Sequence, residues 1–387
     1  MGAPVVAAVF TVHQWIGRIM TASPSASPGP FVSRAFSGSG IPAEIRDIPL
    51  NTVRRALSRD CLARSAPQTF GWLAFDAALY AGSMWGIFGS DSWWAKLLFG
   101  IGAGCAVAFL FVWGHDAAHG ALFRGKWTAE IFGTLSMLPS LNMYRLWCYG
   151  HNRVHHGFTS FTPVDWIWRP LTPAGYAALR WHQRMVYRIE RTPYGCALHY
   201  LLRVWWPGMV MFRPQERSRD RLGFAVDKVI TLAFAIGASA AAWRWGGGVV
   251  GVLAAVIVPF VVFNYFIAFF IFLHHTHPDV PFFDERAEWS NTVGQIYCSI
   301  VVRCSRVSEL LNHNIMVHVP HHVEPRIPFY RLKRAYADLQ REYGNYLHEY
   351  RFRWSTAWMI FRRCKLYDFD SKTWYTYRGG RAASLGL

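Results

Sequence analysis

WAKLLFGIGAGCAVAFLFVWGHDAAH, residues 94–119, joins a long apolar run to a pair of histidines. Residues 94–114 are about as many as an α-helix needs to cross the hydrocarbon core of a bilayer, which is roughly 30 Å thick. His115 and His119 follow directly and are four residues apart, so a continuing helix would project both from one face. The stretch therefore predicts a membrane-crossing helix that ends in paired imidazoles.

Three more apolar runs extend this pattern. Only SDSW separates residues 69–89 from the first run, which predicts a helical hairpin, and RWGGG joins 226–243 to 249–273 in a second hairpin. Shorter apolar patches at 131–147 and 200–212 contain proline or charge and predict interfacial or buried helices. We expect an all-α membrane protein with four transmembrane helices in two hairpins, both termini on one side, and a helical cap on that side.

The glycine-rich segment GIGAGC (100–105) lies inside the first run. A nucleotide-binding glycine loop follows a strand, and no strand is expected here. We therefore interpret these glycines as positions where a neighbouring helix approaches closely.

The basic residues predict the orientation in the membrane. The chain has 40 Lys and Arg against 23 Asp and Glu, a formal net charge of +17, and only Lys96 and Arg244 lie at the two short turns. By the positive-inside rule, the opposite face, with both termini and the histidines, is cytosolic. The charge suits an anionic membrane surface, and without a binding motif it does not indicate nucleic acid.

Composition divides the chain into three parts. Residues 1–66 are rich in Ser, Pro and Arg and predict a mobile or surface N-terminal arm; a signal or transit peptide is the alternative for its beginning. Residues 67–350 contain the membrane domain, and residues 351–387 form a basic cytosolic tail. Seven cysteines without a CxxC pair indicate neither a disulfide framework nor a cysteine metal site.

Most of the 16 histidines lie in four clusters. On the hairpin topology, each cluster lies at the inner end of a span or in the cytosolic segment that follows, so all four reach one face. Isolated histidines are usually ordinary residues, and we expect that of His13, His182, His199 and His348. The clusters are HDAAH (115–119), HNRVHH (151–156), HHTH (274–277) and HVPHH (318–322).

Their spacing predicts two metal ions. His151 and His155 would share a helix face and bind one ion, whereas His156, about 100° further round, would face a second. The cluster at 318–322 repeats this arrangement. Nearly all-imidazole ligation suits iron, copper or zinc, but eight to ten ligands are too many for one tetrahedral zinc. Two iron ions would account for this number of ligands. Their position, where apolar spans meet the cytosol, suits activation of O2 against an unactivated C–H bond.

Other residues near the clusters allow two interpretations each. Asp116 fits equally a partner that fixes an imidazole tautomer and a solvated acid at a helix end. Five aromatic residues are candidates to line an apolar tunnel, although core packing explains them equally well. They are Trp113, Phe123, Tyr144, Trp147 and Phe158.

The histidine clusters resemble those of the membrane-bound fatty acid desaturase family. FLHHTHPDVPFFD (272–284) and NHNIMVHVPHHVEPRIPFYRLKRA (312–335) are most similar to its ω-6 or Δ12 acyl desaturases. The resemblance covers about residues 65 to 350 and implies a non-haem di-iron site under a cytosolic cap. It implies nine ligands, namely His115, His119, His151, His155, His156, His275, His318, His321 and His322.

For the ligand at the end of the last span, His274 and His277 are alternatives to His275. Asn314 or His313 are weaker candidates to complete the set.

Two residues within the clusters are unusual beside metal ligands. Pro320 lies inside HVPHH, and because proline removes a backbone donor and disfavours helical geometry before it, a straight helix there is doubtful. Arg153 lies beside the ligands and is expected to face an acidic partner or a substrate head group, with a plain surface arginine as the alternative.

The resemblance implies O2-dependent insertion of a cis double bond into an acyl-lipid or acyl-thioester. No flavin fingerprint, cysteine cluster or HPGG-type haem segment is visible, so a ferredoxin or cytochrome-type donor would supply the electrons. On the same scaffold, the alternatives are a di-iron hydroxylase, a carotenoid ketolase and an alkene-forming decarboxylase. A histidine-rich metal transporter or haem-binding membrane protein would place polar residues deep within the spans, whereas these histidines gather at the inner ends.

Overall fold

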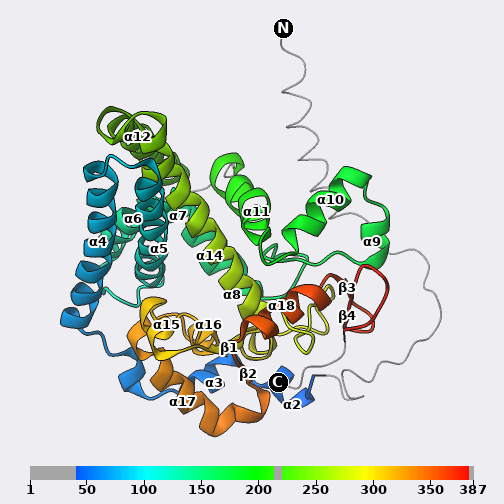
Figure 1. The fold of residues 1–387 in the computed structure, drawn as a ribbon. Coiled ribbons are helices and arrows are strands. Elements are labelled where there is room, and N and C mark those ends of the chain that lie inside the picture. The colour runs from blue at the N-terminus through cyan, green and yellow to red at the C-terminus, as the bar shows by residue number, and fades with distance from the viewer. Residues whose placement is uncertain (1–40, 213–219, 383–387) are drawn as a thin grey trace.

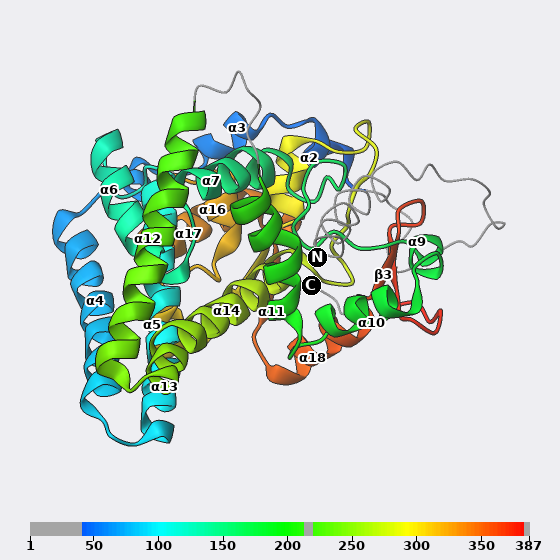
Figure 2. The same ribbon diagram turned by 90° about the horizontal axis from the view of Figure 1, so that it is seen from above.

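The computed structural model describes residues 41–212 and 220–382, which are mostly helical (Figure 1). The first pair of long helices, α4 (Ala66–Gly89) and α5 (Trp93–Ala118), is joined by a short turn. The second pair is α12 (Arg221–Gly246) and a continuous run of α13 (Val249–Val252), η5 (Leu253–Ile257) and α14 (Val258–His275). Seen from above, α4, α5 and α12 lie on one side of the molecule, α9, α10 and α18 lie on the other, and α14 runs between them (Figure 2).

In the described part of the chain, three helical runs are long and apolar enough to cross a membrane: α5, α12 and Val249–His275. They correspond to three of the four predicted spans. α4 is 24 residues long but is not among them, and it carries Asp76 and Thr69 on its buried face. The fourth span and the two-hairpin topology therefore remain predictions.

Close packing between the long helices depends on glycine. A Cβ at Gly100 would lie 2.5 Å from the carbonyl oxygen of Ala254, and a Cβ at Gly104 would collide with α14. Both glycines belong to GIGAGC, so the prediction of close helix packing there is confirmed. At the turn between α12 and α13, Gly247 and Gly248 both adopt positive φ, which ends α12 and reverses the chain.

The segment between α5 and α12 folds into short helices. The apolar patches at 131–147 and 200–212 are helical, as expected. These elements are α6 (Lys126–Met137), η2 (Leu138–Ser140), α7 (Tyr144–Cys148), η3 (Tyr149–His155), α8 (His156–Phe158), α9 (Pro173–Ala177), α10 (Trp181–Glu190), α11 (Cys196–His199) and η4 (Tyr200–Met211).

The segment after α14 corrects the all-α prediction, because it contains two small sheets. β1 (Ile300–Arg303) pairs in parallel with β2 (His348–Arg351), and β3 (Leu366–Asp368) pairs antiparallel with β4 (Thr373–Tyr375). Strands this short carry too little alternation to be recognised in a sequence. The helices of this segment are η6 (Val293–Tyr297), α15 (Arg306–Leu311), α16 (His318–Val323), η7 (Phe329–Arg331), α17 (Leu332–Tyr343), η8 (Gly344–Tyr346) and α18 (Trp354–Arg363).

Both ends of the described chain pack into the main core. Ile45, Val53 and Cys61 come from the predicted arm, and Ile360 and Trp374 from the predicted tail; all five are fully buried. Residues 1–40 and 383–387 lie outside the described residues, and the proposed boundaries of the three parts remain predictions. The arm contributes α2 (Ala43–Asp47), α3 (Leu50–Arg55) and η1 (Arg59–Leu62).

Candidate metal centre

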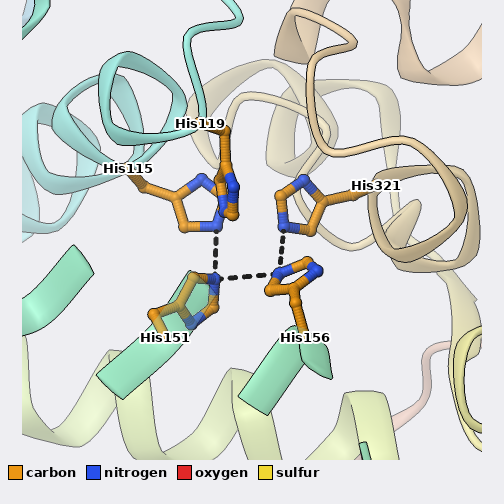
Figure 3. Close-up of side chains that lie close together, drawn as sticks. All are labelled: His115, His119, His151, His156 and His321. Atoms are coloured by element: carbon orange, nitrogen blue, oxygen red, sulfur yellow. Dashed lines mark hydrogen bonds between the residues drawn. The ribbon is translucent and has the colours of Figure 1, made fainter. Parts of the chain in front are cut away.

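Five histidine side chains converge at the end of α5 (Figure 3). Each offers one ring nitrogen, and these nitrogens all lie within 4.8 Å of one another. The Nε2 atom of His151 is 3.1 Å from Nε2 of His115 and 3.1 Å from Nε2 of His156. The Nε2 atoms of His156 and His321 are 3.0 Å apart. This first group is His115, His119, His151, His156 and His321, from α5, its C-terminal cap, η3, α8 and α16.

A second group adjoins the first. It consists of four buried histidines, again with one nitrogen each within 4.8 Å of the others: His155, His275, His318 and His322. The Nε2 atom of His318 lies 3.2 Å from that of His275 and 2.9 Å from that of His322. The rings of His156 and His322 stack with their centroids 4.2 Å apart, so the two groups are in contact. Together they contain all nine histidines expected to be ligands.

The division of the histidines of HNRVHH (151–156) between the two groups differs from our prediction. We expected His151 and His155 to serve one ion and His156 to face the other. Instead His151 and His156 share the first group, and His155 belongs to the second. The cause is η3, a π-helix, in which residues five apart lie on one face. The prediction assumed the α-helical period.

Pro320 does not interrupt the helix at the fourth cluster, so the doubt about helical geometry there was wrong. It is the third residue of α16, and the backbone N–H groups of a helix's first turn have no partner within the helix. His318 and His322, four apart, lie in the second group, and His321 faces the first.

Among the three candidates at the end of α14, only His275 joins a group. His274 stacks on His318 with ring centroids 3.8 Å apart, and its Nε2 contacts Sδ of Met316 at 3.1 Å. His277 lies 3.4 Å from the carboxylate of Asp279 instead. Both alternatives to His275 are therefore turned away from the four-histidine group.

The weaker candidates also lie outside both groups. The Nε2 atom of His313 is 2.8 Å from Oδ2 of Asp76 in α4, and both side chains are fully buried. Both His313 and Asn314 adopt positive φ in the loop before α16. This loop is thus tied to α4 rather than to the centre.

Four of the nine histidines have their Nδ1 atoms held by hydrogen-bond partners, which leaves Nε2 directed to the centre. The Nδ1 atom of His115 is 2.9 Å from Asp116, and that of His155 is 3.1 Å from Asp165. The Nδ1 atom of His275 is 3.0 Å from the carbonyl oxygen of Cys298. Such partners fix the tautomer and the ring orientation of a metal ligand. Asp116 is buried and accepts the backbone N–H of Phe329 at 2.7 Å, which favours the first of its two interpretations.

Gln295 connects the two groups, and Thr159 contacts members of the second group. Oε1 of Gln295 lies 2.7 Å from Nδ1 of His322, while its amide nitrogen donates to the carbonyl oxygen of His156 at 2.6 Å. The Thr159 hydroxyl donates to the carbonyl oxygen of His155 at 2.8 Å. Nothing in the sequence alone assigned a role to Asp165, Gln295 or Thr159. None lies within a histidine cluster, and only Asp165 offers a weak signal, as an acid ten residues after His155.

Burial favours the neutral form of six of these histidines. It lowers the pKa of His119, His151 and His156 well below the usual value, and the neighbouring imidazoles lower it further. The pKa values of His318, His321 and His322 are lowered for the same two reasons. A neutral imidazole keeps a lone pair for a metal ion.

The arrangement fits two adjacent metal ions. Two nitrogen atoms bound to one ion at right angles through bonds of about 2.1 Å lie about 3.0 Å apart. The nearest Nε2 pairs in both groups are separated by 2.9 to 3.2 Å. The buried Nε2 atom of His119 has no hydrogen-bond partner among the described residues, so its lone pair is available. Imidazole nitrogen is a suitable donor for iron.

A cavity of about 870 Å³ adjoins both groups. Its size is typical of a small-molecule site, and its wall is mostly apolar. His115 and His151 of the first group and His155 and His318 of the second form part of this wall. Apolar wall residues near them include Phe111, Val112, Trp147, Phe263, Ile267 and Ile271.

Of the five aromatic residues considered for a tunnel, only Trp147 lines this cavity. Its ring stacks on His151 with centroids 4.2 Å apart. Trp113 instead donates its indole N–H to the carbonyl oxygen of Thr69 and packs on Phe123. Tyr144 and Phe158 also lie outside the wall of this cavity.

The remaining polar candidates are not part of either group. Arg153 is exposed and lies over the ring of Tyr149 at 5.8 Å, as a surface arginine does. His199 stacks on Trp168 at 3.8 Å, His348 is buried near Tyr297, and His182 is exposed. His13 lies outside the described residues.

Comparison with known proteins identifies the family. The fatty acid desaturase family model matches residues 91–354, which include all nine histidines. An sn-1 oleoyl-lipid 12-desaturase of Anabaena variabilis is 27% identical over 336 residues, covering 84% of this chain and 91% of the relative. The protein of the same name from a Picosynechococcus species is 30% identical over 279 residues, 69% of this chain and 75% of the relative. The chloroplastic omega-6 fatty acid desaturase of Glycine max is 29% identical over 279 residues, 71% of this chain and 63% of the relative.

The matched region contains the whole centre together with all three candidate membrane spans. A metal transporter or a haem-binding protein is therefore not the appropriate interpretation of the histidine clusters. The chain belongs to the fatty acid desaturase family, whose members are oxidoreductases that introduce double bonds into acyl chains.

Proposed function

We propose that this protein is an acyl-lipid desaturase of the Δ12 or ω-6 type that holds two non-haem irons. The observation that carries the proposal is the contact of two adjacent groups of buried histidines with one apolar cavity. The first iron would be bound by His115, His119, His151, His156 and His321, and the second by His155, His275, His318 and His322.

With iron bound, the centre would supply the reduction of O2: two hydrogens leave adjacent methylenes, and with two electrons and two protons from outside O2 becomes two waters. The side chains of the protein orient the histidine ligands and bind the acyl chain. Asp116 and Asp165 orient His115 and His155 through Nδ1, so that Nε2 keeps its lone pair toward the centre. The apolar wall around Trp147 binds the acyl chain and excludes water from the histidines.

Substrate, bond position and donor are proposed from the relatives. Two of them are named sn-1 oleoyl-lipid 12-desaturases, which supports a lipid-linked oleoyl chain as substrate and carbon 12 as the site. A further relative, from Synechocystis, is named sn-1 acyl-lipid omega-3 desaturase (ferredoxin) and is 28% identical over 326 residues. We propose a ferredoxin as the electron donor, and the formal charge of +17 would attract an acidic protein of this kind.

The proposed topology has α4 as a fourth span, with the termini and the histidines on the cytosolic side. It is supported by the packing of α4 on α5 and by the location of Lys96 and Arg244 near the two turns. The positive-inside rule then gives the orientation.

The function is tested by expression in a host that lacks polyunsaturated acids, together with a ferredoxin and its reductase. Lipids are analysed by mass spectrometry with localisation of double bonds. The proposal predicts a new diene with its second double bond at carbon 12 in lipid-linked chains. Hydroxylated or shortened chains, or unchanged lipids in cells whose purified protein contains iron, would contradict it.

A further inference from the structure

The wall of the cavity includes two helices with exposed apolar faces. α10 contributes Val186 and Tyr187 to the cavity, while Trp181, Met185 and Ile189 lie four residues apart on its outer face with 75%, 50% and 43% of their surface exposed. Large exposed apolar side chains in such a row are typical of a helix that lies in a membrane surface.

η4 forms a similar part of the wall. Leu202 and Trp206 line the cavity and are also 41% and 46% exposed, so the cavity reaches the surface of the molecule at this helix. Trp166, in the loop before α9, likewise both lines the cavity and is exposed. Tryptophan is enriched at the boundary between lipid and water. The rim of the cavity is therefore apolar on its outer side.

Arg169 supplies a cation in this same wall. Its side chain is half-buried and lines the cavity, and its guanidinium makes no hydrogen bond or ion pair with the residues that the structure describes. Asp284 is an exposed acid whose charge acts on it from beyond ion-pair distance. A partly desolvated guanidinium with five N–H donors favours an anionic partner, and a phosphate matches its geometry.

The position of Arg169 is fixed by α10. Arg191, one residue after the end of that helix, donates to the carbonyl oxygens of Trp168 and Arg169 at 3.0 and 2.8 Å. Two residues further on, the N–H of Leu171 donates to the Tyr187 hydroxyl at 3.1 Å. The loop that carries Arg169 is thus attached at two points to the helix with the exposed apolar row.

We propose that Arg169 binds the phosphate of a membrane phospholipid whose acyl chain occupies the cavity, and that the chain enters from the bilayer past α10 and η4. The inference rests on the proposed function, because it specifies the head group of that substrate. A soluble acyl thioester also carries phosphate, but the exposed apolar rim matches a bilayer rather than water.

The test measures lipid binding by full-length, metal-free protein in detergent. A fluorescent phosphatidylcholine is displaced by dioleoyl phosphatidylcholine, by dioleoyl monogalactosyl diacylglycerol, which has no phosphate, or by oleoyl-CoA. Arg169→Gln should weaken phosphatidylcholine binding about 10- to 100-fold, as expected for one lost charge-assisted contact, and change galactolipid binding less than about twofold. Arg180→Gln, at an exposed arginine outside the cavity wall, is the matched control and should leave both unchanged.

The deciding quantity is the ratio of the dissociation constant for phosphatidylcholine to that for the galactolipid. This ratio does not depend on the fraction of folded protein. If Arg169→Gln folds poorly, Arg169→Lys keeps the charge and should retain part of the phospholipid preference. An unchanged ratio in Arg169→Gln would overturn the inference, and so would tighter binding of oleoyl-CoA than of phosphatidylcholine. Because binding is measured without iron, loss of the phosphate preference and absence of desaturation are separate results.

Discussion

A hydrogen bond to one ring nitrogen of a histidine fixes the tautomer and directs the other nitrogen to a metal ion. In the second group, His155 depends on Asp165, whose carboxylate also accepts the backbone N–H groups of Ser160 and Ile167, each at 3.1 Å. These two backbone hydrogen bonds fix the position of the carboxylate. The carboxylate in turn fixes the orientation of the His155 ring.

Replacing Asp165 should weaken metal binding in the second group alone. For Asp165→Ala we expect about 10- to 100-fold lower affinity for one of two ferrous ions, the usual effect of losing such a partner. Asp165→Asn retains an oxygen acceptor and should lose less. The measurement is anaerobic titration of purified protein with Fe(II), and two binding steps like those of the unmodified protein in Asp165→Ala would contradict this role.

The adjacent histidines at the end of α14 provide a matched pair of substitutions. His275→Ala removes a member of the second group and should reduce bound iron from two ions towards one per chain. His274→Ala removes a ring that stacks on His318 but directs its Nε2 to Met316, so the iron content should stay at two. Elemental analysis of both variants decides, and a greater loss in His274→Ala would reverse the assignment.

At this scale the sequence predicted which histidines gather but not what holds them. The four clusters identify themselves by density and by their relation to the apolar runs. Asp165, Gln295 and Thr159 have ordinary sequence surroundings, and only the fold brings Gln295 against His322 and His156.

Among the elements, η3 decides which histidine serves which group. The apolar runs predicted helices because an apolar face repeats along many residues. A π-helical segment depends on a local shift of hydrogen bonding that leaves no such repeat, so its five-residue spacing was not predictable from HNRVHH. The short strands β1 to β4 were missed for a similar reason.

Gly100 tests the packing between α5 and η5. A Cβ there would meet the carbonyl oxygen of Ala254 at 2.5 Å, so Gly100→Ala should separate the helices and destabilise the protein by about 1–3 kcal/mol. Gly82→Ala is the matched control, because no atom lies within 4 Å of its added Cβ and alanine favours a helix. Thermal unfolding in detergent should show a lower midpoint only for Gly100→Ala; equal midpoints would contradict the packing.

His348, the first residue of β2, makes the stability of the protein sensitive to acid. Burial lowers its pKa to about 4, against the opposing effect of Asp279. Between the usual pKa of about 6.5 and 4, the unfolded chain binds a proton that the folded chain does not, so acid favours unfolding. In metal-free protein, His348→Phe should therefore lose less thermal stability than the unmodified chain between pH 7 and pH 5. Parallel pH profiles would show that His348 is protonated equally in both states.

For the whole molecule, the sequence predicted the membrane class and the single site, but not how the ends of the described chain complete the fold. Residues 41–66 and 354–382 have no long apolar run, so composition favoured a surface arm and a tail. Val53 of the first segment and Trp374 of the second are nonetheless fully buried in the main core. The deciding factor is which surface each short helix covers, and that depends on the tertiary structure.

The number of irons bound per chain tests the proposed two-iron centre most directly. Protein purified anaerobically and loaded with Fe(II) should contain two irons by elemental analysis, and His155→Ala should contain about one and form no diene. One iron in the unmodified chain, or two irons and full activity in His155→Ala, would contradict a centre divided between a group of five and a group of four histidines.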